Sequence, residues 1–308
     1  TTYTKTETDF LIQQLEKTQQ QVNYNGGYKW HSRVGGYLKN ERVVLNNGDI
    51  VKSTIDGNTN DPNVDMTGWK KESSQIYFKT YDELRNYKGS GDFSSINGRY
   101  VDGQFYLDTT DSTSADNGGT IIVDAKGGRW KRIYSDGLNP RWFGAKGDGT
   151  SDDSAAFLKL LDVCATINNT GGTPVIKMGS GDVYKITYNP VPVGDPTDIY
   201  DDPRTKSFYY LSGSKWQSTF VNGVEKYPEI RIEGNGATII CDGNDYSWFF
   251  SSGRNHSLII SNLQFKSSGR SATAGCILET MCLYSYFENV TFAGFTKGVA
   301  LNIARERN

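Results

Sequence analysis

Apolar runs that end at an asparagine recur along the second half of the chain. Asn235, Asn262 and Asn289 lie 27 residues apart, and the last two continue alike, as Asn-Leu-Gln-Phe and Asn-Val-Thr-Phe. A fixed period of this size is typical of repeat architectures. Short β-branched and aromatic runs separated by Gly and Asn predict the coils of a β-solenoid. Because stacked coils place equivalent positions next to one another, we expect neighbouring asparagines to pair.

A different pattern opens the chain. After a Thr-x-x-Glu capping box, Leu11, Leu15, Thr18 and Val22 alternate spacings of four and three, which is the seam of a coiled coil. A helix of about 20 residues is marginally stable on its own. The pattern therefore predicts an oligomerising helix over residues 1–24, with Leu11, Leu15 and Val22 in the seam. The alternative is a helix that lies on the following domain.

Turn-forming residues divide the next part of the chain into two small modules. Residues 25–75 predict a small β module. Residues 76–140 predict an α+β module, in which a capping box at Thr80 starts a helix that runs through Tyr87. In the same module, residues 100–107 predict a hairpin with an Asp-Gly turn. Strands are expected over residues 42–45, 50–52, 120–123 and 129–133.

Residues 141–308 predict a capping helix followed by solenoid coils. A Thr-x-x-Asp box at Thr150 caps a helix with a wide apolar face, and a Gly-Gly pair at 171–172 ends it. A terminal coil needs a cover, so we expect this helix to lie over the first coil. Residues 188–226 interrupt the repeat and predict a surface loop or a packing lid. No cap follows the last coil, so we expect an N-terminal piece of a longer protein.

Composition limits the possible partners. Lys and Arg together number 33 against 35 acids, so the chain has no basic bias and nucleic acid is not an expected partner. No apolar run approaches the roughly 20 residues that span a bilayer. Aromatic residues make up 13% of the chain and Gly numbers 34, a mixture that favours strands and turns over helices.

The cysteines predict neither metal binding nor redox chemistry. They form no C-x-x-C pair, and the chain has only two histidines, so we expect no metal site and no cofactor. The favoured interpretation is buried, reduced thiols in a protein that folds in a reducing cytosol. The alternative is a link from Cys241 to Cys276 or Cys282 in a neighbouring coil. The four cysteines are Cys164, Cys241, Cys276 and Cys282.

Carboxylates are too numerous on the coils to identify a catalytic pair. Glycoside hydrolysis needs two carboxylates about 5–9.5 Å apart. Many such pairs can be built, because alternate strand residues share a face and equivalent positions stack. The catalytic residues are therefore unknown among the candidates Glu225, Glu229, Glu233, Asp242, Asp245, Glu279 and Glu288. Asp148, Asp152 and Asp153 better fit a turn and a helix N-terminus, where acids contribute about 0.3–1 kcal/mol.

Three stretches carry a resemblance to known families. Residues 142–157, Trp-Phe-Gly-Ala-Lys-Gly-Asp-Gly-Thr-Ser-Asp-Asp-Ser-Ala-Ala-Phe, resemble the motif that opens pectate-lyase-like right-handed parallel β-helices. Residues 116–132 look like the segment that precedes this motif in bacteriophage tailspikes. Residues 47–69 are similar to N-terminal modules of phage tail fibres and tailspikes. Together these stretches cover most of residues 40–165.

This resemblance implies a mainly β chain with small attachment modules and a right-handed parallel β-helix. It further implies a homotrimer whose N-terminal modules contact other virion tail or baseplate proteins. The β-helix would bind, and in the whole protein depolymerise, bacterial capsular or O-antigen polysaccharide. The expected location is the phage tail of the virion, after assembly in the host cytoplasm. This fragment is not expected to hold a complete active site.

The aromatic residues of the 188–226 segment are candidates for contact with sugar. Tyr and Trp rings offer an apolar face and a polar edge, which suits carbohydrate. The candidates are Tyr209, Tyr210 and Trp216. Packing of the segment onto the β-helix is the competing explanation for all three. At the level of the whole protein, two alternatives stay open, namely a secreted bacterial polysaccharide lyase or hydrolase with accessory β modules, and a non-enzymatic adhesin.

Overall fold

The computed structural model describes residues 28–47, 49–71, 76–89, 91–187, 191–192, 206–211, 216–242, 247–252, 257–268, 275–280 and 284–302. The expected helix over residues 1–24, with Leu11, Leu15 and Val22, lies outside them, as does Cys282. The described residues form two compact units. The first contains residues 28–116 and 120–133, and the second contains residues 117–119 and 134–302.

The first unit begins with a four-stranded sheet. Its strands are β1 (Tyr28–Lys29), β2 (Arg42–Val44), β3 (Ile50–Ser53) and β4 (Trp69–Lys71), paired in that order. The predicted strands at 42–45 and 50–52 are thereby confirmed. Their apolar side chains form a small core in which Tyr37 and Trp69 meet edge to face, with ring centroids 5.3 Å apart.

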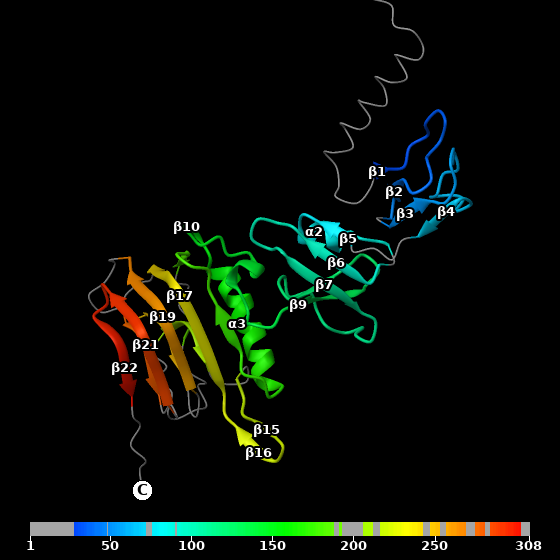
Figure 1. The fold of residues 1–308 in the computed structure, drawn as a ribbon. Coiled ribbons are helices and arrows are strands. Elements are labelled where there is room, and N and C mark those ends of the chain that lie inside the picture. The colour runs from blue at the N-terminus through cyan, green and yellow to red at the C-terminus, as the bar shows by residue number, and fades with distance from the viewer. Residues whose placement is uncertain are drawn as a thin grey trace, which may run out of the picture. The chain divides into compact units, whose positions relative to one another are not determined.

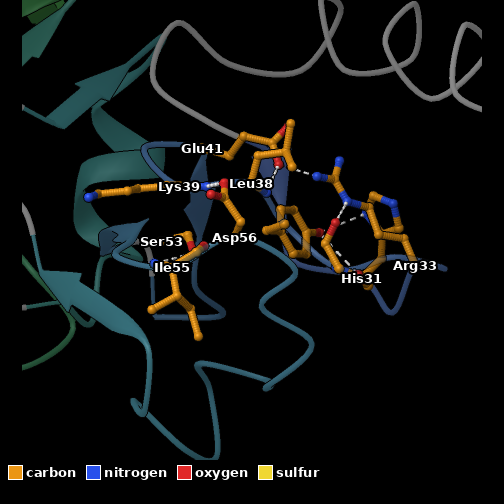
Figure 2. A network of polar contacts seen from close by, with 10 residues as sticks. His31, Arg33, Leu38, Lys39, Glu41, Ser53, Ile55 and Asp56 are labelled. Atoms are coloured by element: carbon orange, nitrogen blue, oxygen red, sulfur yellow. Dashed lines mark hydrogen bonds and ion pairs between the residues drawn. The ribbon is translucent and has the colours of Figure 1, made fainter.

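A polar network holds the loops of this sheet, as Figure 2 shows. The Arg33 guanidinium pairs with the Glu41 carboxylate and lies over the Tyr37 ring, with its central carbon 4.1 Å from the ring centroid. The backbone amide of Lys39 donates to Asp56 at 2.8 Å. These contacts tie loops that are distant in sequence onto one small core.

A five-stranded sheet follows, in the order β5-β6-β7-β9-β8. A helix of five residues, α2 (Tyr81–Arg85), packs with it around the buried Trp130 and Phe105. The predicted capping box is confirmed, because the Thr80 side chain accepts from the amide of Glu83. The strands are β5 (Ile76–Phe78), β6 (Phe93–Ile96), β7 (Gly103–Asp108), β8 (Ile121–Val123) and β9 (Arg129–Ile133).

Two local predictions in this sheet are wrong. The helix ends at Arg85 and does not reach Tyr87. No hairpin forms within residues 100–107, because β7 begins at Gly103 and pairs with β6. Gly103 has φ 155°, and a Cβ there would lie 1.9 Å from the guanidinium of Arg132. The glycine therefore accommodates a packed arginine and does not form a two-residue turn.

A buried hydrogen bond joins the two sheets of the first unit. The Tyr87 hydroxyl donates to the Asp49 carboxylate at 2.9 Å, and the Lys71 ammonium lies 3.1 Å from the other carboxylate oxygen. Burial raises the pKa of Tyr87, so the phenol stays protonated and acts as a donor. Whether the two sheets act as separate modules stays a prediction.

The second unit opens with a connector and a helix. These are the 3-10 helix η1 (Pro140–Phe143), β10 (Asp148–Asp152) and α3 (Ser154–Asn169). The predicted cap at Thr150 is wrong. Asp153 is the N-cap residue, but its side chain makes no cap hydrogen bond, because it accepts from the backbone amides of residues 146–147 instead.

Parallel strands then wind as coils, which confirms the predicted parallel β-helix. One sheet stacks β12, β17, β19 and β21, the other stacks β14, β18, β20 and β22, and every pairing among these strands is parallel. Figure 1 shows β17, β19 and β21 side by side. Their bounds are β11 (Val175–Lys177), β12 (Val183–Thr187), β13 (Val191–Pro192), β14 (Lys206–Leu211), β15 (Thr219–Val221), β16 (Val224–Lys226), β17 (Glu229–Asp242), β18 (Ser247–Ser252), β19 (Ser257–Ser267), β20 (Gly275–Thr280), β21 (Tyr284–Ala293) and β22 (Lys297–Asn302).

The coil interior is filled by stacks of apolar side chains. Phe265 and Phe292 occupy equivalent positions on β19 and β21, and their rings stack with centroids 5.5 Å apart and planes within 4°. Phe157 of α3 meets Tyr184 of β12 edge to face at 5.2 Å, so the helix covers the first coil as expected. No described helix is long and apolar enough to cross a membrane.

The expected interruption over residues 188–226 is only partly correct. Residues 206–211 form β14, which pairs in parallel with β18 and belongs to the second stack. The polar and aromatic composition of these residues concealed the strand. Residues 219–226 do leave the stack, as the β15–β16 hairpin.

Candidate functional site

Each of the strands β17, β19 and β21 bends at its asparagine. Asn235, Asn262 and Asn289 all have φ of 51°, in the left-handed region that a short polar side chain tolerates. The Asn289 amide nitrogen donates to the Asn262 side-chain oxygen at 2.8 Å, which confirms the predicted pairing for these two coils. The bend divides each strand into two straight halves.

A groove follows this line of bends, and we call it the asparagine groove. It has a volume of about 410 Å³. No charged side chain lines it, so its polar contacts come from amides, hydroxyls and backbone. Within it, the Thr238 hydroxyl donates to Gln264 at 3.2 Å. The lining residues are Asn235, Gly236, Ala237, Thr238, Asn262, Leu263, Gln264, Asn289 and Thr291.

Outward side chains form three rows before the bend, and we call them the outer rows. The strand register places β17, β19 and β21 residues next to one another, and alternate residues share the side that faces away from the core. Tyr284 and Tyr286 are 51% and 54% exposed, so two aromatic rings stand on one face of β21. The rows are Glu229, Ser257 and Tyr284; Arg231, Ile259 and Tyr286; and Glu233, Ser261 and Glu288.

Hydrogen bonds orient the first of these rows. The Tyr284 hydroxyl donates to Glu229 Oε2 at 2.7 Å, across the small Ser257, and the Arg231 Nε donates to Glu229 Oε1 at 2.7 Å. Burial opposes ionisation of Glu229, but the two hydrogen bonds outweigh it, and the pKa of Glu229 is lowered. The same bond to a carboxylate raises the pKa of Tyr284. The row therefore carries a fixed carboxylate and an oriented phenol.

The β15–β16 hairpin directly precedes β17 in the chain. Asn222 and Gly223 form its turn with φ of 52° and 78°, as a two-residue hairpin turn requires. Phe220 pairs with Glu225 on the hairpin and is 74% exposed. The Tyr227 hydroxyl donates to Glu225 at 3.0 Å. An exposed aromatic ring thus lies on the segment that leads directly into the outer rows.

The predicted sugar-binding aromatics lie elsewhere. Tyr209 and Trp216 are 6% and 4% exposed, and the Trp216 indole nitrogen donates to the Tyr209 hydroxyl at 3.2 Å. The backbone of Tyr210 belongs to β14. These positions agree with the packing explanation, and sugar contact by the three residues stays a prediction. The sequence did contain a signal for Tyr284 and Tyr286. The two residues lie two positions apart just before the repeat asparagine Asn289, and residues two apart on a strand share a face.

The carboxylates considered for catalysis occupy several environments. Asp148 accepts from the amides of Thr150 and Ser151, which agrees with a turn role. Glu233 lies 3.4 Å from the Lys177 ammonium, and Asp242 lies 3.3 Å from that of Lys185. Asp245 lies outside the described residues, and only the backbone of Glu279 is described, in β20. Among the described residues, no cluster of His, Cys, Asp or Glu could hold a metal ion.

Known proteins resemble separate parts of this chain. Residues 77–135 match the family described as phage tail protein small four-stranded β-sheet domain. The Mu-like prophage FluMu defective tail fibre protein of Haemophilus influenzae is 39% identical over 70 residues, which are 22% of this chain and 11% of that protein. The chain thus spans about a tenth of that relative's length.

Solved tailspike structures also align with the chain. That of Acinetobacter baumannii phage AM24 has 27% identity and a TM-score of 0.43, covering 69% of this chain and 33% of the tailspike. That of Acinetobacter phage vB_ApiP_P1 has 18% identity and a TM-score of 0.49, covering 74% and 36%. The chain spans about a third of each tailspike. Residues 77–135 thus resemble a phage tail β-sheet domain, and the parallel strands of the second unit wind as a β-helix.

Proposed function

We propose that this chain is the N-terminal part of a phage tailspike whose β-helix binds a bacterial surface polysaccharide. One observation carries the proposal. A phage tail domain at residues 77–135 stands in the same chain as a parallel β-helix that exposes Tyr284 and Tyr286 beside an uncharged groove. The first feature supports a place in the virion tail, and the second supports a ligand outside it.

The chemistry of the face suits carbohydrate. An exposed phenol ring offers an apolar face for the C–H groups of a sugar and a polar edge for its hydroxyls. The groove adds amide and hydroxyl groups, which donate and accept hydrogen bonds and so match sugar hydroxyls. Depolymerisation belongs to the proposal for the whole protein, and its catalytic residues are unassigned.

The proposed assembly is a homotrimer held in part by the seam of Leu11, Leu15 and Val22. The N-terminal modules are proposed to contact other tail or baseplate proteins, after assembly in the host cytoplasm. Light scattering on the full chain tests the assembly, and a monomer would contradict it. Labelling of phage particles with an antibody to residues 28–133 tests the location, and unlabelled tails would contradict that part.

Binding of polysaccharide is tested with a matched pair of tyrosines. Tyr284→Ala combined with Tyr286→Ala should weaken binding to purified host polysaccharide by at least tenfold, since both rings are lost. Tyr106, which is 38% exposed on β7 of the first unit, provides the control as Tyr106→Ala. Equal binding by both variants would contradict the assigned face. New reducing ends or unsaturated sugars after incubation with the whole protein would distinguish an enzyme from an adhesin.

A further inference from the structure

We infer that the asparagine groove takes an uncharged stretch of polysaccharide, and that the acids at its rim exclude sugars bearing carboxylates. This inference rests on the proposed function and adds the chemical class of the ligand. It follows from three features of the second unit, namely the lining of the groove, the charge at its rim and the state of the nearby cations.

The lining offers nothing that would bind an anion strongly. All nine residues around the groove are uncharged, and six of them contribute an amide or a hydroxyl side chain. A carboxylate on a bound sugar would lose its water there without gaining an ammonium or guanidinium partner. Transfer of an unpaired charge out of water is costly, whereas a sugar hydroxyl can exchange its water contacts for amide contacts. The groove alone therefore favours neutral sugars.

The rim on the side of the outer rows is acidic. Glu288 directly precedes Asn289 on β21, and Glu233 lies two residues before Asn235 on β17. Both belong to the same outer row, with Ser261 between them, so two strand spacings of about 4.8 Å separate their backbones. A sugar chain that enters the groove across this row passes between two carboxylates. Because Glu233 is paired with Lys177, Glu288 supplies most of the rim charge that repels an anionic ligand, above all at low salt.

The cations around the face are engaged by acids. Lys177 lies 3.4 Å from Glu233, and the Nε of Arg231 is bound to Glu229. On the other side of the bend, Lys185 lies 3.3 Å from Asp242. Lys266 is exposed on β19, two residues beyond Gln264 and outside the groove lining. Among the described residues, Lys266 is therefore the cation that we expect an anionic sugar to use if the inference is wrong.

The test is binding of the full 308-residue chain to an array of purified bacterial surface polysaccharides, half of them neutral and half rich in uronic acids, at low ionic strength. We expect binding to neutral polymers only. Thr291→Trp fills the groove and should abolish that binding while the thermal unfolding midpoint stays unchanged. Glu288→Gln should raise the ratio of uronate-polymer to neutral-polymer binding by about threefold, in line with one exposed charge interaction. Lys266→Gln is the matched charge control and should change neither.

The possible outcomes separate the two levels of the proposal. Binding of uronate polymers that Lys266→Gln weakens would overturn the inference and leave polysaccharide binding intact. Neutral binding that survives Thr291→Trp would place the ligand elsewhere and also overturn it. Binding to no polysaccharide of either class would contradict the proposed function, and the inference with it.

Discussion

The side-chain amide of Asn289 donates a 2.8 Å hydrogen bond to the side-chain oxygen of Asn262, one coil earlier in the sequence. Both residues hold φ of 51°, so their side chains leave the bend in the same direction and meet. The contact joins residues one 27-residue period apart, as expected where equivalent positions of neighbouring coils stack. Both residues line the asparagine groove.

Substitutions at Asn262 should lower stability through the lost side-chain hydrogen bond and through the left-handed backbone conformation. Asn262→Ala removes the hydrogen bond and leaves in the left-handed conformation a residue that tolerates it less well than Asn, with an expected loss of about 2–3 kcal/mol in the free energy of unfolding. Asn262→Gly removes the bond but tolerates the conformation, so its loss should be about 1 kcal/mol smaller. Urea denaturation measures both, and equal losses would show that the left-handed bend carries no strain.

The Phe265 ring should carry much of the stability of the coil interior. Phe265→Ala leaves a cavity against Phe292 and should cost about 3–5 kcal/mol in the free energy of unfolding. Phe220→Ala is the control, since its ring is 74% exposed and should cost less than about 0.5 kcal/mol. Thermal unfolding compares the two, and similar midpoints would contradict the assigned stacking.

Asp182 should link the stability of the second unit to acid pH. It accepts from Arg141 at 2.6 and 2.9 Å and from the Tyr184 hydroxyl at 2.5 Å. Burial opposes ionisation, but these bonds outweigh it and lower the pKa of Asp182. A lowered pKa gives stability that is present above the unfolded value of about 3.9 and is lost as the pH falls through the folded value.

Removal of that charge tests the link. Asp182→Asn should lower the free energy of unfolding by about 2–4 kcal/mol at pH 7, because the Arg141 cation is left without its partner. The difference from the natural chain should shrink as the pH falls below about 4. Asp242→Asn breaks the more exposed pair with Lys185 and should cost less than about 1 kcal/mol. A difference for Asp182→Asn that does not change with pH would contradict the assignment.

Tyr284 should keep the Glu229 carboxylate ionised. Tyr284→Phe retains the ring but removes the donor, so the pKa of Glu229 should rise toward its ordinary value. Since that pKa is lowered in the folded chain, the stability from this contact is present above about pH 4.3 and is lost as the pH falls through the folded value. Carbon-detected NMR titration of Glu229 measures the shift. Arg231→Met removes the other donor and should act in the same direction.

The buried thiols should be unreactive in the folded chain. Cys164, Cys241 and Cys276 are free and buried, and burial raises the pKa of Cys164 well above that of an exposed thiol. Because the thiolate is the reactive form, iodoacetamide should label these three residues only after denaturation. Peptide mass spectrometry reads each site, and labelling of Cys164 under native conditions would contradict its position on the buried face of α3.

The repeat asparagines show what a period in the sequence can predict. Their period predicted both the coils and the Asn262–Asn289 contact, because a solenoid repeats its geometry whenever the chain repeats its length. β14 was missed because it does not share that period. Lys206 of β14 pairs with Ser247 of β18, which lies 41 residues later in the chain, so this coil has a different length. Pattern alone could not align strands without a constant period.

The aromatic residues show that a sequence pattern cannot predict which side of a strand is buried. Tyr209 and Tyr284 are the same residue type in similar strands, yet one is 6% exposed and the other 51%. Alternation along a strand shows that neighbouring residues face opposite sides, but not which side is covered. For Tyr209 the cover comes from Trp216 and from Asp162 of α3, at sequence distances of 7 and 47 residues.

The sequence alone determined the order of the elements, the winding of the chain and the residues at each bend. These features depend on neighbouring residues and on a fixed period. The proposed binding face could not be predicted in this way. It arose when the register brought Glu229 beside Tyr284 across an intervening strand, and when the bends of three coils aligned into one groove. A sequence pattern cannot predict such a surface, because its residues come together only after the coils have stacked.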